Sequence, residues 1–135
     1  LKLSAIDSTN LRLEAIDALE LHFQPRGGPS TRQSPPWAEA ARDELTAFLK
    51  LGEVRYLAPR GLRVVSASGD GAPGWILSRT LEVNGRPVSF AFSGRAPFAD
   101  GESVELTPAL LKTSLNFHLL ARGLVYPLFY DGLFY

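Results

Sequence analysis

The sequence predicts a mainly β protein of the α+β class, a five-stranded Greek-key barrel of the OB type with two or three helices. Three observations predict this fold. Short β-branched and aromatic runs alternate with turn residues, one helical pattern interrupts them near the middle, and a second lies near the end. With 135 residues, 45% of them hydrophobic, the chain can bury one ordinary core, so we expect a single domain over residues 1–135.

The chain is expected to open with two strands. Apolar residues alternate with polar ones over residues 1–6 and again over 11–16, with turn residues between them, which is typical of a hairpin. Residues 22–36 contain four prolines and two glycines without a period, and indicate an irregular surface loop. From Trp37 the apolar spacing becomes helical, and Gly52 suits the end of this helix.

The middle of the chain is predicted to be β again. Asn84-Gly85 between two apolar runs favours a tight hairpin, and residues 87–92 should form the strand after it. Three further β-branched or aromatic runs precede that turn, at residues 53–59, 61–68 and 74–83.

One more helix is expected near the end of the chain. Thr107 and the proline after it are typical of the first turn of a helix. Leucines recur at helical spacing after them, and Gly123 is typical of the residue that ends a helix. We therefore expect a single helix from Thr107 to about Arg122.

Charge and composition exclude several classes of function. Basic and acidic residues number 14 each, so the chain has no overall field that attracts polyanions, and any affinity for phosphate must be local. The absence of cysteine excludes disulfides, thiolate catalysis and sulfur-ligated metal centres, and leaves the cellular compartment open. No apolar run reaches the roughly 18 to 20 residues that span a bilayer, so no membrane partner is expected.

Charged residues interrupt the apolar segment at 11–21. Strict alternation would place Arg12 and Asp17 on opposite faces, so they can meet only if the strand bends or ends near Ile16, with a turn at Asp17. Asp17 and Glu20 lie three apart, a spacing that a helical turn brings to one side. Taken alone, these residues are more typical of a surface ion pair and a turn.

Together with two other motifs, these residues resemble the sequence pattern of the staphylococcal-nuclease-like (thermonuclease) family. Arg12 to Glu20 has that family's arginine, aspartate and glutamate at matching spacing. "EVNGR" at residues 82–86 resembles its Asp-x-x-Gly-Arg loop, with a glutamate in place of the aspartate. "LNFHLLARGL" at residues 115–124 is similar to a helix that closes with a Gly-Leu step. Three motifs in the family's order are moderately specific.

The resemblance implies a calcium-dependent nuclease that hydrolyses DNA, RNA or smaller nucleotides. Arg12 and Arg86 would clamp the phosphoryl oxygens, and Glu20 would act as general base on the attacking water. Asp17 and the backbone carbonyl of Ala18 would bind Ca²⁺, a cation that prefers carboxylate and carbonyl oxygens. We expect a monomer whose partners are nucleic acids or nucleotides, with no cofactor beyond the metal.

The aromatic residues at the end of the chain have two interpretations. They stack on bases, as in proteins that bind single strands, or they belong to the core and its contacts. The resemblance favours Tyr126 or Tyr130 for contact with a base, because the family places tyrosines just after its Gly-Leu step.

The sequence also departs from the family pattern. Leu19 replaces the usual proline, and the loops near residues 60–74 and 94–106 look inserted. The family carries a further metal-binding aspartate in an earlier strand, and the only upstream candidate here is Asp7, in the turn just before residue 11, where that ligand is not expected. Because the chain also opens on Leu1 and stops within an aromatic run at Tyr135, we expect it to lack an N-terminal strand, which would hold that aspartate, and a C-terminal tail. The alternatives are a catalytically degenerate OB-fold module that binds nucleic acid or a protein partner, and a purely structural ion network.

Overall fold

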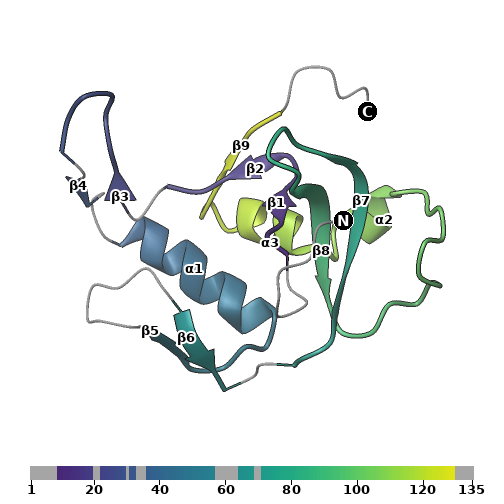
Figure 1. Cartoon of the computed structure of the whole chain (residues 1–135). Helices are drawn as coiled ribbons and strands as arrows, with labels where there is room; N and C mark the ends of the chain where they lie inside the picture. Colours follow the sequence, from purple (N-terminus) through teal and green to yellow (C-terminus); the bar gives the residue numbers. More distant parts are fainter. Residues whose placement is uncertain are drawn as a thin grey trace.

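The central element of the fold is a three-stranded sheet with the strand order β1-β8-β7 (Figure 1). The computed structural model describes residues 9–19, 22–29, 31–32, 36–56, 64–68 and 71–129. Over these ranges the chain is a mixed α+β protein. Its elements, in order, are β1 (Arg12–Leu13), β2 (Ile16–Asp17), β3 (His22–Phe23), β4 (Thr31–Arg32), α1 (Trp37–Phe48), β5 (Val54–Tyr56), β6 (Val64–Ala67), β7 (Gly74–Leu81), β8 (Pro87–Ser93), α2 (Pro108–Leu111), α3 (Leu115–Ala121) and β9 (Tyr126–Pro127).

The pairing of β8 brings two of the predicted site residues to the same end of the sheet. β8 runs antiparallel to β7 and parallel to β1, where Arg12 lies opposite Val88. A tight turn joins β7 to β8: Gly85 N donates a hydrogen bond to Glu82 O, and Gly85 has a φ of +79°, which glycine adopts without strain. Because this turn ends at Arg86, the register of β1 on β8 places Arg12 near Arg86.

The strand predicted over residues 11–16 is broken into β1 and β2. Ala15 has a φ of +59°, in the left-handed region, and redirects the chain away from the central sheet. β2 then pairs antiparallel with β9, where Asp17 lies opposite Tyr126. The expectation of a bend is confirmed, but the predicted position at Asp17 is wrong, because the chain turns at Glu14 and Ala15.

A buried asparagine on α3 fixes this bend to the sheet. The Asn116 side chain is only 2% exposed. Its Nδ2 donates to Glu14 O at 2.8 Å and to Ser89 O at 3.1 Å, and its Oδ1 accepts from Ala91 N at 3.1 Å. One side chain therefore joins the end of β1, the middle of β8 and the first turn of α3.

The hydrophobic core lies where α3 packs on β8 and α1 packs on α3 (Figure 1). Its buried centre consists of Ile16, Ala91, Leu115 and Leu119. Since Ile16 belongs to β2, burial of this side chain also holds the segment that carries Asp17.

The loop that follows β8 folds back towards β7. Trp75 of β7 stacks on Phe92 of β8 with ring centroids 4.0 Å apart, and Phe98 of the loop meets Trp75 edge-on at 5.7 Å. The segment near residues 94–106 therefore packs on the sheet through an aromatic contact.

Most elements agree with the sequence, and the differences have local causes. The helix expected from Thr107 to Arg122 is two helices, because Ser114 caps a second start: its Oγ accepts from Phe117 N at 3.1 Å. The loop expected at residues 22–36 contains a short ladder between β3 and β4. The helix from Trp37, the strands near the middle and the Asn84-Gly85 hairpin are confirmed.

Some expectations reach beyond the described ranges. Residues 1–8, which hold the first predicted strand, lie outside them. The described strands form one three-stranded sheet and three two-stranded ladders, and do not by themselves close a barrel. Within the same ranges, no helix is long and apolar enough to cross a bilayer.

Candidate functional site

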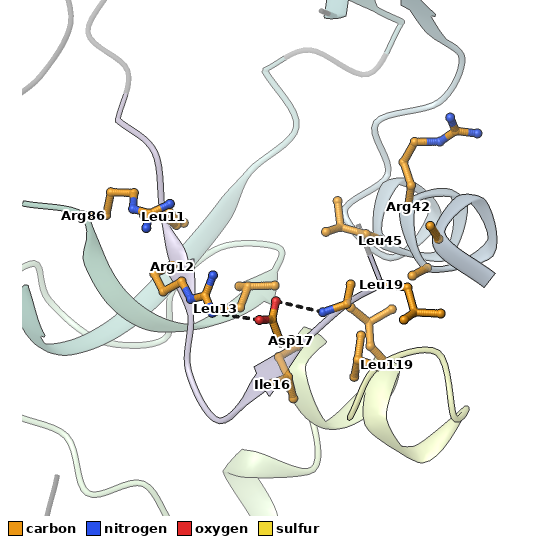
Figure 2. A pocket seen from close by; sticks show the side chains of 14 residues that line it. Leu11, Arg12, Leu13, Ile16, Asp17, Leu19, Arg42, Leu45, Arg86 and Leu119 are labelled. Atoms are coloured by element: carbon orange, nitrogen blue, oxygen red, sulfur yellow. Dashed lines mark hydrogen bonds and ion pairs between the residues drawn. The ribbon is translucent and has the colours of Figure 1, made fainter. Parts of the chain in front are cut away.

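A pocket of about 350 Å³ brings together four of the predicted site residues. Arg12 from β1, Asp17 from β2, Ala18 and Arg86 all line it (Figure 2). The other walls come from α1, α3 and the segment before β9. Two sequence motifs that lie some seventy positions apart thus meet at one cavity.

Arg12 and Asp17 form an ion pair inside this pocket. Arg12 Nη2 donates to Asp17 Oδ2 at 3.1 Å, and the other carboxylate oxygen accepts from Ala18 N, also at 3.1 Å (Figure 2). Both charged side chains are partly exposed. The bend at Ala15 makes this contact possible, because it redirects β2 so that Asp17 reaches the guanidinium on β1.

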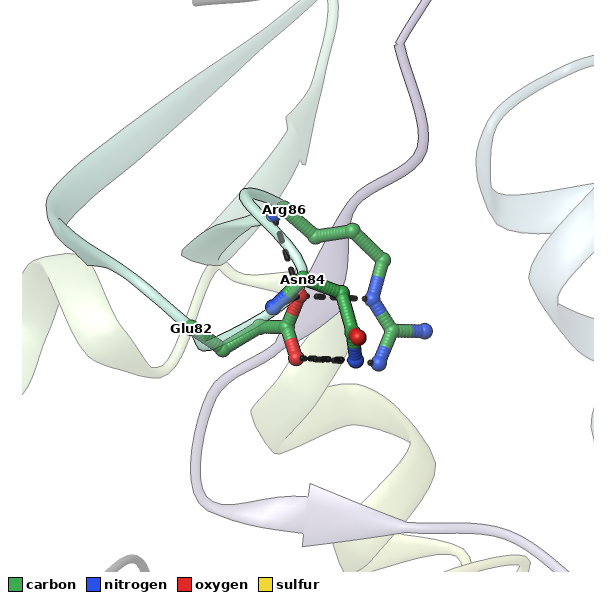
Figure 3. Close-up of polar contacts among 3 residues, drawn as sticks. All are labelled: Glu82, Asn84 and Arg86. Carbon is green, nitrogen blue, oxygen red and sulfur yellow. Dashed lines mark hydrogen bonds and ion pairs between the residues drawn. The ribbon is translucent and has the colours of Figure 1, made fainter.

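Arg86 is held in place by the turn that precedes it (Figure 3). Its Nε donates to Glu82 Oε1 at 3.1 Å and its Nη2 to Glu82 Oε2 at 3.3 Å. The same carboxylate accepts from Arg86 N at 3.1 Å, and from Asn84 N and Nδ2, both at 2.9 Å. Only 13% of the Glu82 side chain is exposed. Glu82 thereby positions the guanidinium at the edge of the pocket.

This hydrogen bonding lowers the pKa of Glu82. The Arg86 side chain is the largest cause; partial burial opposes it, and the Arg86 backbone N–H and the Asn84 side chain add to it. The pKa falls from 4.5 to about 2, so Glu82 stays charged throughout the neutral and mildly acidic range.

Replacement of Glu82 by glutamine should give a pH-dependent loss of stability. Because the folded-state pKa lies below the ordinary value, the carboxylate stabilises the fold fully above about pH 4.5, and this contribution is lost as the pH falls towards about 2. The difference in Tm between the natural chain and Glu82→Gln should therefore be constant near neutrality and shrink below pH 4.5. Thermal melts from pH 2 to 7 measure it, and a difference that does not depend on pH contradicts the assignment.

Tyr126 lies beside the pocket rather than in its wall. It is opposite Asp17 in the β2–β9 ladder, and opposite residues in an antiparallel pair share a face. Its side chain is 46% exposed, which leaves a ring surface open to a ligand. Two other predicted site residues, Glu20 and Tyr130, lie outside the described residues.

Helix α1 contributes a wall that the motifs do not indicate. Ala38, Ala41, Arg42 and Leu45 line the pocket from one face of the helix, at spacings of three and four residues. The two alanines are buried, and their small side chains let α1 lie close to the pocket. Arg42 adds a third arginine. The helical spacing from Ala38 to Leu45 indicates that Arg42 shares their face, but only the packing of α1 shows that this face meets the pocket.

A metal ion would find few ligands among the described residues. No three carboxylate, histidine or cysteine side chains gather anywhere in the described ranges. In the pocket, the donors expected for Ca²⁺ are the Asp17 carboxylate and the Ala18 carbonyl, whereas Ca²⁺ takes six to eight oxygens. The donor chemistry fits Ca²⁺, with water and substrate oxygens as the remaining ligands.

A second pocket is larger, and the predicted site residues do not reach it. It measures about 700 Å³ and lies between β7, β8 and residues 101–106. Its lining, as far as the structure describes it, includes none of the residues that the motifs single out. The smaller pocket is therefore the candidate site.

The candidate pocket gathers three guanidinium groups. Its described lining carries Arg12, Arg42 and Arg86 against one carboxylate, Asp17. Two further carboxylates outside that lining, Asp43 and Glu82, pair with Arg42 and Arg86, so the site concentrates N–H donors rather than net charge. The comparisons with protein-family models, curated proteins and solved structures give no match. Function must therefore be argued from this geometry.

Proposed function

We propose that this chain is a calcium-dependent phosphodiesterase of the staphylococcal-nuclease-like family that hydrolyses DNA or RNA. The observation that carries the proposal is that Arg12, Asp17 and Arg86, which come from two separate motifs, line one pocket. We also propose that the complete fold is an OB-type barrel. The mixed sheet β1-β8-β7, with helices packed beside it, supports that extension.

The lining of the pocket suits a nucleoside phosphate. Guanidinium groups match phosphate oxygens in geometry and bind them through paired N–H donors. The remaining lining is mainly aliphatic, with Leu13, Leu45 and Val125 among its members, and such surface favours contact with a sugar or base. Tyr126, beside Asp17, is placed where a base could stack on it.

Arg12 and Arg86, the two arginines predicted to bind the phosphoryl oxygens, are already oriented before substrate binds. Asp17 holds Arg12, and Glu82 holds Arg86, so neither guanidinium has to be immobilised when substrate binds. Their N–H donors would stabilise the negative charge that grows on the phosphoryl oxygens in the transition state. Glu20 would take the proton of the attacking water.

Calcium would be held by Asp17 and the Ala18 carbonyl. When bound, it supplies Lewis-acid polarisation of a phosphoryl oxygen. The Asp17 carboxylate can bind Arg12 and Ca²⁺ at the same time, because each of its oxygens accepts more than one contact.

The direct test is cleavage of a fluorescent single-stranded oligonucleotide with calcium or with chelator. We expect cleavage only with calcium, and a loss of about 10²- to 10⁴-fold in Glu20→Gln, which removes the base. Asp17→Asn should lose the calcium-dependent rise in Tm that we expect of the natural chain. Asp100→Asn is the matched control, because Asp100 is an exposed carboxylate outside the pocket lining, and it should keep both properties.

Two results would contradict the proposal. One is a folded natural chain that cuts neither DNA nor RNA, and the other is full calcium stabilisation of Asp17→Asn. A chain that binds oligonucleotides without cutting them would instead be a degenerate binding module. That second candidate is favoured by one observation: Asp17 is the one carboxylate in the described lining of the pocket.

A further inference from the structure

Arg42 has no role in the proposed chemistry, yet it lines the same pocket as Arg12 and Arg86. It comes from α1, whereas the other two arginines come from the sheet and its turn. Figure 2 shows the Arg42 guanidinium well apart from the Arg12–Asp17 pair and from Arg86, with Leu45 between Arg42 and Asp17. The pocket therefore offers cationic groups at two separate places, with aliphatic surface between them.

The contact that Arg42 makes with Asp43 is one that a ligand can replace. Arg42 Nε and Nη2 approach the same oxygen, Asp43 Oδ1, at 2.8 and 2.7 Å. The two side chains are 34% and 65% exposed, and an exposed pair of adjacent residues contributes little to stability. By contrast, Glu82 is largely covered and binds Arg86 through both oxygens. Asp43 thus holds Arg42 less firmly than Glu82 holds Arg86.

We propose that Arg42 binds the phosphate next to the one that is cut, so that the site prefers substrates with two consecutive phosphodiesters. This inference rests on the proposed function. A phosphate between Arg12 and Arg86 leaves Arg42 on the opposite wall, and a nucleic-acid strand carries its next phosphate one nucleotide away. The aliphatic surface between the two positions would contact the intervening sugar or base.

The test compares two kinds of trinucleotide that differ in one charge. One has two phosphodiesters, and the other has a neutral methylphosphonate in place of one of them, in each of the two possible positions. For the natural chain, KM should be about tenfold lower for the doubly charged substrate, the effect of one charge-assisted contact, with kcat little changed. Arg42→Ala should abolish this preference, and Arg42→Lys should restore part of it.

The double comparison separates a phosphate contact from a structural effect. In Arg42→Ala, the methylphosphonate should cause no further loss, because the contact is already absent. Arg95→Ala is the control: Arg95 is exposed, follows β8, and is not in the pocket lining, so this variant should keep the preference. If Arg42→Ala raises KM equally for both substrates, or if the natural chain shows no preference, the inference is overturned.

Binding distinguishes failure of this inference from failure of the nuclease proposal. If no trinucleotide is cut, fluorescence anisotropy of the same labelled molecules still measures affinity. An Arg42-dependent preference for two charges without cleavage would uphold the inference and overturn the nuclease. Cleavage with equal affinity for both substrates would uphold the nuclease proposal and overturn the inference about Arg42.

Discussion

Replacing Arg86 by alanine should lower kcat for oligonucleotide cleavage by about 10³-fold, with a much smaller change in KM. Loss of one fixed donor to a charged transition state typically costs 10²- to 10³-fold, and an arginine that stabilises phosphoryl transfer contributes about 10³- to 10⁵-fold. Arg86 is a fixed donor because Glu82 holds its Nε and Nη2. Arg86→Lys should recover only part of the rate, since an ammonium group cannot offer two parallel N–H donors.

The measurement is steady-state kinetics on a fluorescent oligonucleotide, with Tm recorded for each variant. Val83→Ala is the control from the same turn, because Val83 is almost fully exposed and should tolerate truncation. An Arg86→Ala variant that is folded and keeps its kcat would remove this residue from the mechanism. An increase in KM alone would show that Arg86 binds ground state and transition state equally.

Replacing Asn116 by alanine should lower the free energy of unfolding by roughly 3 kcal/mol. The substitution removes three hydrogen bonds, and it leaves Glu14 O and Ala91 N without their side-chain partner, whereas Ser89 O still accepts from Glu14 N. An unsatisfied buried group costs about 1–3 kcal/mol. The sum is less than two full penalties because the vacated space can admit water. The bend at Ala15 should also loosen, so the activity per folded molecule should fall.

Urea denaturation measures this effect, and Leu120→Ala provides the control. Leu120 is on the same helix but exposed, so its truncation should change stability by no more than about 0.5 kcal/mol. If Asn116→Ala were as stable as the control variant, the three hydrogen bonds would not hold the bend. A fully folded Asn116→Ala with unchanged activity would also separate Asn116 from the geometry of the site.

The parts of the site that the sequence could predict are those that depend on short-range signals. The Asn84-Gly85 turn places Arg86 at the start of a strand, and the spacing from Arg12 to Asp17 shows that the chain must bend. The position of the bend could not be predicted, because it depends on Asn116, which is 102 residues away from Glu14 in the chain. Alanine has no local preference for the positive φ that Ala15 adopts.

The same distinction holds for the helices. The apolar spacing from Trp37 predicts α1, but not that its face towards the pocket contains Arg42. That placement depends on how α1 packs in the folded chain. The split of the last predicted helix into two did have a local signal, because Ser114 is an N-cap residue before an apolar run. The continuous helical spacing of the leucines hid this signal. Closure of a barrel depends on pairing between strands that lie far apart in sequence, and local sequence patterns do not specify such pairing.

The alanines of α1 suggest how the selectivity of this site could change without altering its chemistry. Ala38 and Ala41 form part of the wall opposite the sheet, and neither takes part in the proposed reaction. Larger side chains at these two positions would narrow the cavity, while Arg12, Asp17 and Arg86 would keep their own supports on other elements. For evolution or engineering, one helix face could thus tune the size of the ligand that fits, while the strands and the turn carry the groups of the proposed reaction.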